Sequence, residues 1–353
     1  MNTVNTALYP KDLGYTFPAE WEKHEATWLS WPHKNESWPD RIHLIFPAYA
    51  QFIAELTKGE KVRINVKNEE MKAFALSYIE QTDADLNQVE FFFHETNDAW
   101  CRDHGPAFLI NRQQPDHKKV IVDWGFNAWG GKYPPFENDD VIPTKIAKAF
   151  NLPVFYPGII MEGGSVEFNG AGALLTSKSC LLNENRNPEH TQEQIEEYLK
   201  NYYGVSQILW VEDGIVGDDT DGHVDDTIRF INEDTVLTVI EDHIEDDNYE
   251  LLQTNLRQLQ EMKLEDGRSL NIITLPMPDG VYCEGERLPA SYANFYIANK
   301  SVIVPTYRCA KDTIALDIIQ KCFPDRKVVG IDSTDIIWGL GSFHCLSQQE
   351  PAI

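Results

Sequence analysis

One arrangement of apolar and polar residues recurs along the chain. Two segments in which apolar and polar residues alternate are separated by a turn, and a stretch with helical periodicity and another short apolar segment follow them. Alternation is typical of β-strands, whereas apolar residues three or four positions apart are typical of an amphipathic helix. The pattern therefore predicts a repeated unit of strand, turn, strand, helix and strand.

Five copies of this unit can be followed along the sequence. Copies two to five each have the order strand, strand, helix and strand. The second copy is predicted at 107–111, 119–123, 142–150 and 153–156, and the third at 165–168, 173–176, 191–203 and 207–211. The fourth copy is predicted at 227–232, 235–240, 249–262 and 270–275, and the fifth at 294–298, 301–306, 312–322 and 327–331. The first copy is the least regular, with a strand at 26–31, a helix at 42–56, a strand at 61–66, and an inserted helix and strand at 69–79 and 88–93.

Five such units favour a closed α/β fold with pseudo-fivefold repeats, in a single domain that spans residues 1–353. Each unit alone would leave one face of its sheet bare, so neighbouring units must pack together. The competing architecture, a doubly wound sheet, needs a glycine-rich strand-to-helix turn near the N-terminus. The sequence has no such turn there.

Composition narrows the classes of partner. The net charge of −26 argues against nucleic acid, whose phosphates need clustered Lys and Arg. A negative field instead favours the approach of a small cation, although acidity that only keeps the protein soluble explains the charge equally well. With 42% hydrophobic and 24% charged residues, the chain has the ordinary composition of a globular protein with a sizeable core.

Neither a membrane segment nor an export signal is expected. No stretch approaches the roughly 20 apolar residues that span a bilayer, and residues 1–5 lack the basic and apolar regions of a signal peptide. The 6 cysteines lie far apart without a CxxC pair, so we expect reduced thiols, a cytoplasmic location, and no metal site. No cofactor is expected, and a homo-oligomer is left open.

Five segments rich in reactive side chains lie at the junctions between units. Together they contain a thiol, an imidazole, several carboxylates, and glycines that let the backbone approach closely; they are 97–103, 161–164, 221–225, 287–295 and 339–345. In a circular arrangement of units these junctions would converge on the axis. The combination suits nucleophilic attack on a cationic carbon.

Cys345 is the leading candidate for the nucleophile. Its neighbours are Ser, His and Gln rather than an apolar strand, and a cationic surrounding would favour the reactive thiolate. A buried cysteine is more often a small inert hydrophobe. Cys101 is a rival beside Arg102 and Asp103, although no His-x-Asp motif lies near it in sequence.

The other candidates supply charge and proton transfer. His223 and Asp225 lie in an acidic segment just before a predicted strand, so they can face the same way as an acid/base imidazole beside a carboxylate. A solvated acidic loop is the alternative, and the ligand spacing of an EF-hand is missing. Asp103, beside the aromatic wall of Trp100, could hold a guanidinium through two parallel hydrogen bonds. Glu162 is costly to bury unless an Arg or a cationic ligand pairs with it.

In combination these motifs resemble the guanidine-modifying (pentein) superfamily, and within it the agmatine deiminase and Porphyromonas-type peptidylarginine deiminase family. The resemblance runs over nearly the whole chain and is carried by Asn97-Asp98-Ala99-Trp100-x-Arg102-Asp103-x-Gly105-Pro106, Glu162-Gly163-Gly164, Gly222-His223-Val224-Asp225, Ser291-Tyr292-Ala293-Asn294-Phe295-Tyr296 and His344-Cys345. It implies a five-bladed α/β propeller (the pentein fold), which agrees with the five units above.

The resemblance also implies roles for individual residues. Cys345 would be the nucleophile and His223 the general acid/base, Asp103 and Asp225 would bind the guanidinium, and Glu162 would orient the substrate and support proton transfer. Two departures lie beside the site. The family often has Asn-Gly-His where this chain has Asp-Gly-His at 221–223, and Gly-Gly-Gly where it has Gly-Leu-Gly at 339–341.

The implied activity is that of a metal-free hydrolase, a deiminase that converts agmatine to N-carbamoylputrescine and ammonia through a covalent thiouronium on the cysteine, toward putrescine in polyamine biosynthesis. Three alternatives remain: an arginine or peptidylarginine deiminase that receives the carboxylate or backbone through Arg229 or Arg287, an amidinotransferase, and a non-catalytic cation-binding protein. Agmatine is favoured if a carboxylate of the acidic run, such as Asp218 or Asp221, faces the pocket and binds the substrate's ammonium.

Overall fold

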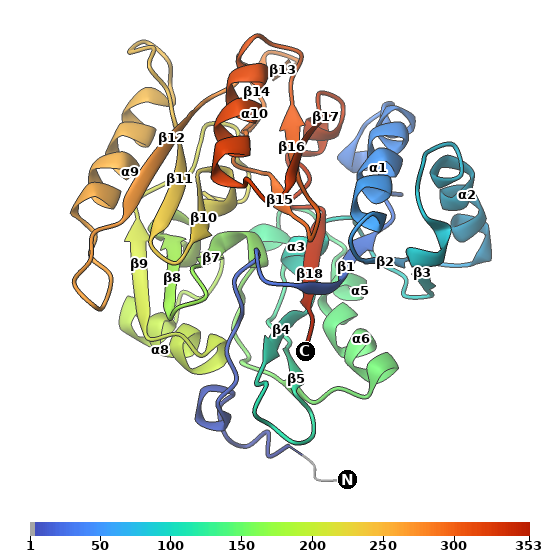
Figure 1. The fold of residues 1–353 in the computed structure, drawn as a ribbon, viewed down its shortest axis with the longest axis vertical. Helices are drawn as coiled ribbons and strands as arrows, with labels where there is room; N and C mark the ends of the chain where they lie inside the picture. Colours follow the sequence, from blue (N-terminus) through green and yellow to red (C-terminus); the bar gives the residue numbers. More distant parts are fainter. Residues whose placement is uncertain (1–3) are drawn as a thin grey trace.

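The computed structural model describes residues 4–353 and shows a mixed α/β fold built on five small sheets (Figure 1). The sheets follow one another around the molecule in sequence order, and the short helix α3 (Cys101–His104) and strand β18 (Ser347–Pro351) lie near the centre of the view. Residues 1–3, which the predicted domain and the expected absence of a signal peptide include, lie outside the described part of the chain.

The five sheets share one pattern of strand pairing. In strand order they are β18, β1 (His24–Ser30), β2 (Lys61–Asn65) and β3 (Val89–Phe92); β4 (Ala107–Ile110), β5 (Lys119–Val122) and β6 (Val154–Phe155); β7 (Val166–Phe168), β8 (Ala173–Ser177) and β9 (Gln207–Val211); β10 (Ile228–Asn232), β11 (Thr235–Ile240) and β12 (Asn271–Pro276); and β15 (Tyr296–Ile297), β16 (Ser301–Thr306) and β17 (Lys327–Asp332). The first pair of each sheet is antiparallel and the next is parallel. The predicted repeat is confirmed.

A helix connects each pair of parallel strands, because a parallel connection needs a crossover. These helices are α1 (Ile42–Thr57), α2 (Glu69–Ile79), α6 (Ile142–Phe150), α8 (Gln192–Tyr203), α9 (Tyr249–Glu261) and α10 (Lys311–Cys322). Local sequence sets their ends. Helix α8 begins with a capping box between Thr191 and Gln194, and it ends at Gly204, whose φ of 69° is left-handed.

Shorter elements complete the described chain. They are the helices α4 (Ala128–Gly131), α5 (Glu137–Asp140) and α7 (Lys178–Leu181), the 3-10 turns at Lys11–Leu13, Asn35–Ser37, Leu86–Gln88, Gly163–Ser165, Val224–Asp226 and Ile336–Gly339, and a hairpin of β13 (Tyr282–Cys283) and β14 (Glu286–Arg287). No helix among residues 4–353 is both long and apolar enough to cross a membrane.

The first sheet departs from the sequence-based expectation. The polar residues after Cys345 predict no strand, and this is wrong, because Ser347–Pro351 forms β18 and pairs antiparallel with β1. The strand is buried although it is polar, because ion pairs take the place of apolar contacts. The carboxylate of Glu350 accepts hydrogen bonds from Lys119 Nζ (2.7 Å) and Trp28 Nε1 (2.8 Å), and it also pairs with Arg63.

Candidate active site

A cleft with a volume of about 580 Å³ lies above the junctions that carry the reactive segments. Cys345, Asp103, Trp100 and Trp129 are among its lining residues. Trp100 is stacked on Trp38 with ring centroids 5.3 Å apart, which fixes one aromatic wall of the cleft. The sequence-based expectation that the junction segments meet is therefore confirmed for 97–103, 287–295 and 339–345, each of which contributes to this lining.

The thiol of Cys345 is held just inside this cleft. Its Sγ accepts a hydrogen bond from Asn294 Nδ2 (2.9 Å) and lies 3.5 Å from Asp225 Oδ2. Burial raises the pKa of Cys345 well above its usual value, and the charges of Asp225, Asp226 and Asp103 raise it further. The thiol is therefore protonated while no cation occupies the cleft. The sequence indicates Asn294 only as one residue of a longer motif, whereas the structure shows that its side chain donates to the sulfur.

Asp103 is supported by two donors from other segments. The carboxylate on α3 accepts hydrogen bonds from the Gly164 amide (2.9 Å, to Oδ1) and from Trp129 Nε1 (3.0 Å, to Oδ2). Burial, Asp225 and Glu162 raise its pKa well above the usual range. Trp129 has a left-handed φ of 56°, a strained conformation for a non-glycine residue that is typical of functional sites. No pattern in the sequence distinguishes Trp129 from the other tryptophans.

The imidazole of His223 is buried close to the carboxylate of Asp103. It lies at the start of a 3-10 turn that leads into strand β10, as its predicted place just before a strand requires. Its Nδ1 is 3.7 Å from Asp103 Oδ1, and neither ring nitrogen has a hydrogen-bond partner among the described residues. Burial lowers the pKa of His223 to about 3, so the ring is neutral near neutral pH.

Asp225 presents one free oxygen. Its Oδ2 is 2.6 Å from His344 Nδ1, whereas Oδ1 is buried without a partner among residues 4–353. Burial alone would raise the pKa of Asp225, but the hydrogen bond from His344 and the nearby cationic groups lower it below the usual value. Asp225 is therefore ionised in a dry site, with hydrogen-bonding capacity left over for a ligand.

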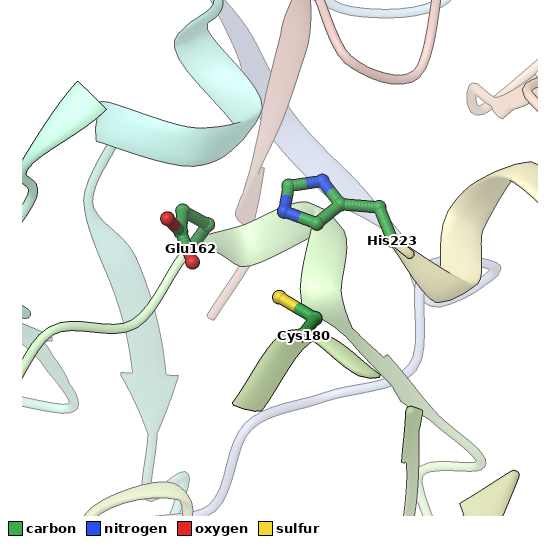
Figure 2. A group of neighbouring side chains, drawn as sticks. All are labelled: Glu162, Cys180 and His223. Atoms are coloured by element: carbon green, nitrogen blue, oxygen red, sulfur yellow. The ribbon is translucent and has the colours of Figure 1, made fainter. Parts of the chain in front are cut away.

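Glu162 lies close to His223, with the Cys180 thiol beside them (Figure 2). Glu162 Oε1 accepts a hydrogen bond from Arg186 Nε (2.7 Å), which confirms that this buried carboxylate is paired with an Arg. Its Oε2 is without a partner in the described chain. The ligand atoms of Glu162, Cys180 and His223 lie within 4.8 Å of one another, as metal ligands would. We assign no metal here, because Arg186 already supplies positive charge to the carboxylate.

Two carboxylates expected to bind substrate do not line the cleft. Asp221 faces Arg186 Nη1 (2.8 Å) and Lys132 Nζ (2.8 Å), and Asp218 accepts hydrogen bonds from Thr220 and from the His223 amide (2.8 Å). Asp218 and Asp221 are not among the residues that line the cleft, and neither are Glu162, His223 and Asp225, so a contact of Asp218 or Asp221 with the substrate's tail stays a prediction. Both stabilise the segment that carries the imidazole, because their oxygens are taken by protein donors.

Gly164 is needed where the catalytic side chains converge. A Cβ at this position would lie 2.5 Å from His223 Nδ1, 2.9 Å from Asp103 Oδ1 and 3.2 Å from Asp225 Oδ2. We expect Gly164→Ala to lower kcat/KM at least about tenfold, since overpacking costs roughly 1–3 kcal/mol and here it displaces the reacting groups. Steady-state kinetics would check this. Gly158→Ala is the control: an added Cβ meets nothing within 4 Å there, although the φ of 80° is left-handed, so it should lower stability and retain wild-type kinetics; equal loss of kcat/KM in both variants would contradict the argument.

A buried thiol and a carboxylate that line one cleft, with an imidazole and a second buried carboxylate packed against them, on five α/β units, are typical of the guanidine-modifying (pentein) enzymes. Within that class the chain belongs to the Porphyromonas-type peptidyl-arginine deiminase family, whose model matches residues 16–351.

Three of the similar proteins are named agmatine deiminases. The chain is 34% identical over 373 residues to an agmatine deiminase of Pseudomonas aeruginosa (strain LESB58), with 99% of this chain and 98% of the relative covered. The solved structure of agmatine deiminase of Enterococcus faecalis is 32% identical and has a TM-score of 0.91, with 99% of each chain covered. A cysteine-to-serine variant of agmatine deiminase of C. jejuni, solved with substrate bound, is 34% identical and has a TM-score of 0.85, with 95% of this chain and 96% of that chain covered.

Proposed function

We propose that the protein is an agmatine deiminase, which hydrolyses agmatine to N-carbamoylputrescine and ammonia. The observation that carries the proposal is a thiol set among buried carboxylates at the edge of an acidic cleft. A guanidinium is a planar cation whose N–H groups match carboxylates pairwise. The relatives named above act on, or bind, a substrate of this type.

Binding of the guanidinium would activate the nucleophile. Asp103 and the free Oδ1 of Asp225 would accept its N–H groups, and its charge would offset the carboxylates that raise the pKa of Cys345. The thiol proton can then pass to the neutral imidazole of His223, which leaves a thiolate facing a cationic carbon. Glu162, whose Oε2 is free, supports the imidazolium that forms.

The reaction then proceeds in two displacements. The thiolate forms a C–S bond to the guanidinium carbon, and the C–N bond breaks as His223 donates its proton to the departing ammonia, which leaves a thiouronium on Cys345. Water next attacks the same carbon and gives a proton to His223. The C–S bond breaks, the ureido product leaves, and the sulfur recovers its proton.

The charges along the cleft favour a cationic tail over a carboxylate. The anionic lining residues are Glu36, Asp40, Asp98, Asp103, Asp219, Glu284 and Glu286. Its two cationic residues are already engaged, because Lys34 lies 3.5 Å from Asp98, and Arg41 pairs with Asp335 (3.8 Å) and stacks on Trp338.

The arginines considered as carboxylate receptors are occupied too. Arg287 pairs with Asp246 (2.6 Å), and Arg229 is fully buried against Glu20 (2.9 Å) and Glu167 (3.1 Å). No free guanidinium is therefore available from these two residues to bind the α-carboxylate of arginine. This geometry weighs against the arginine and peptidylarginine alternatives.

We expect agmatine to be preferred over free arginine by roughly ten- to a thousandfold in kcat/KM, since one carboxylate contact at a few ångströms is worth about 1 to 4 kcal/mol. Ureido product formed from agmatine, arginine and a blocked arginine peptide would be compared in one colorimetric assay. Equal or higher kcat/KM for arginine would overturn the proposed substrate. Release of ammonia without an added amine acceptor separates this activity from amidino transfer.

We further propose that the five sheets close into a five-bladed α/β propeller with one catalytic domain, and that the enzyme acts in the cytoplasm without metal or cofactor. The support is the order of the sheets around the molecule and the pairing of β18 with β1, which joins the last segment to the first sheet. A homo-oligomer stays an open prediction, as does the absence of nucleic-acid and membrane partners.

A further inference from the structure

A single buried carboxylate links four segments that build the site. Glu20 Oε1 accepts hydrogen bonds from Arg229 Nη2 (2.9 Å) and the amide of Ile297 (2.8 Å). Glu20 Oε2 accepts from Arg102 Nη2 (3.2 Å) and lies 2.8 Å from His344 Nε2. These partners come from the neighbourhoods of the acid/base, the guanidinium ligand, the Asn-bearing motif and the nucleophile, so Glu20 fixes the segments relative to one another.

His344 lies between this carboxylate and Asp225. Its Nε2 faces Glu20 Oε2, and its Nδ1 is 2.6 Å from Asp225 Oδ2. Each ring nitrogen of His344 therefore lies within hydrogen-bond distance of a buried carboxylate oxygen. The ring is thereby held at both ends, and it determines which oxygen of Asp225 is engaged and which one, Oδ1, is left free.

Neither residue is among those that line the cleft, so each acts on the reaction through its contacts, and the contact with a proposed substrate ligand is the one between His344 and Asp225. Burial would raise the pKa of Glu20, but Arg229 and His344 hold it well below the usual range. Buried charges of this kind are stable only when each is paired and hydrogen-bonded. Removing one member leaves the others unpaired in a dry environment.

We propose that His344 and Glu20 are positioning residues for Asp225: Glu20 orients the His344 ring, and His344 holds Asp225 with Oδ1 free for the guanidinium. The inference rests on the proposed function and adds a chain of two residues behind the substrate-binding carboxylate. It requires that loss of either residue raises KM for the cation by more than a general loss of folding stability would explain.

The test compares His344→Asn and Glu20→Gln with the unaltered chain, measuring kcat and KM for agmatine from the lowest pH at which all three stay folded up to neutral pH, because an unperturbed Asp carboxyl group titrates near about pH 4. We expect kcat/KM to fall roughly 10- to 100-fold, as for partners that orient a ligand-binding group, with most of the loss in KM. The acid limb of the profile should also move to higher pH. The pKa of Asp225 is held low by its surroundings, so weaker support raises it, and activity is lost earlier as pH falls.

The dependence of kcat/KM on pH also reflects the charged and titratable groups around Asp225. They are His344, His223, Arg229, Asp103, Asp218, Asp226 and Cys345. Glu350→Gln is the matched control, because Glu350 is a buried carboxylate with several cationic partners away from the site. It should lower thermal stability without moving the acid limb.

Three outcomes decide the matter. An unmoved acid limb and an unchanged KM in both variants would overturn the inference, as would the same shift in Glu350→Gln. Should His344→Asn fail to fold, Glu20→Gln alone gives the answer, since it keeps the size of the side chain. A wild-type chain that forms no ureido product from agmatine would overturn the proposed function itself, which distinguishes the two failures.

Discussion

Replacing Cys345 by Ser is expected to abolish turnover of agmatine while leaving its binding in place. A hydroxyl of nearly the same size keeps the hydrogen bond from Asn294, but it cannot supply the thiolate that the mechanism needs. The rate should fall by at least about 10⁴-fold, as it does when the nucleophile of a hydrolase is removed. Product formation over hours would report the rate, and calorimetric titration would report binding.

The pH dependence of that binding follows from the carboxylates. Burial, Asp225 and Glu162 raise the pKa of Asp103. A bound guanidinium favours the ionised form of Asp103, so binding releases a proton, and affinity should rise as pH rises toward this raised pKa. A titration of the Ser variant at several pH values would check the sign.

The rival thiol provides the control for this experiment. Cys101 is fully buried, and burial raises its pKa to about 12. Cys101→Ser should therefore retain the activity of the unaltered chain, apart from a modest loss of stability. Full activity in Cys345→Ser, or loss of activity only in Cys101→Ser, would refute the assignment of the nucleophile.

Asp225→Asn is expected to cause the second largest loss. The amide keeps the shape of the side chain but removes the charge that faces the guanidinium, His344 and the sulfur. Loss of one partner from a buried charged pair costs on the order of 2–5 kcal/mol, which is roughly thirty- to several thousandfold in kcat/KM. Both KM and kcat should change, because the same residue binds the cation and influences the thiol.

Asp218→Asn serves as the comparison for this variant. Asp218 lies in the same acidic segment, but both of its oxygens accept hydrogen bonds, from Thr220 and from the His223 amide, whereas Asp225 Oδ1 has no partner in the described chain. We expect a smaller effect, mainly on kcat, through a displaced imidazole. Wild-type kinetics in Asp225→Asn would show that the residue is structural, and the guanidinium site would then have to be built on Asp103 alone.

The repeated units could be predicted because burial and hydrophobicity coincide in them. Strands β8, β11 and β16 are buried along nearly their whole length and consist mostly of apolar and β-branched residues, so their pattern is visible in the sequence. Strand β18 could not be predicted in this way. Its Gln349 and Glu350 are buried by hydrogen bonds to Arg102, Arg63 and Lys119, which hydropathy does not register.

Only those residues of the site that lie in short motifs could be predicted from the sequence. The residues that carry the chemistry lie in compact segments whose composition is unusual, and the structure brings Asp103 and Cys345 to one cleft. Their supporting partners lie far away in sequence: Trp129 binds Asp103, Arg186 binds Glu162, and Glu20 binds His344 across 324 positions. Hydrophobic periodicity contains no information on such pairs, because they depend on which junctions meet.

The pairing of β18 with β1 has a consequence for how the protein acquires its activity. The two strands belong to opposite parts of the sequence, with Leu29 opposite Ser347, and contacts of such separation form late because a long loop must close before they stabilise anything. The amide of Arg102 also donates to the carbonyl of Cys345 (3.1 Å), so the nucleophile is fixed in the same event. During refolding, partly assembled units would thus acquire helices and sheets before they acquire a reactive centre, and catalysis would report the final step of assembly.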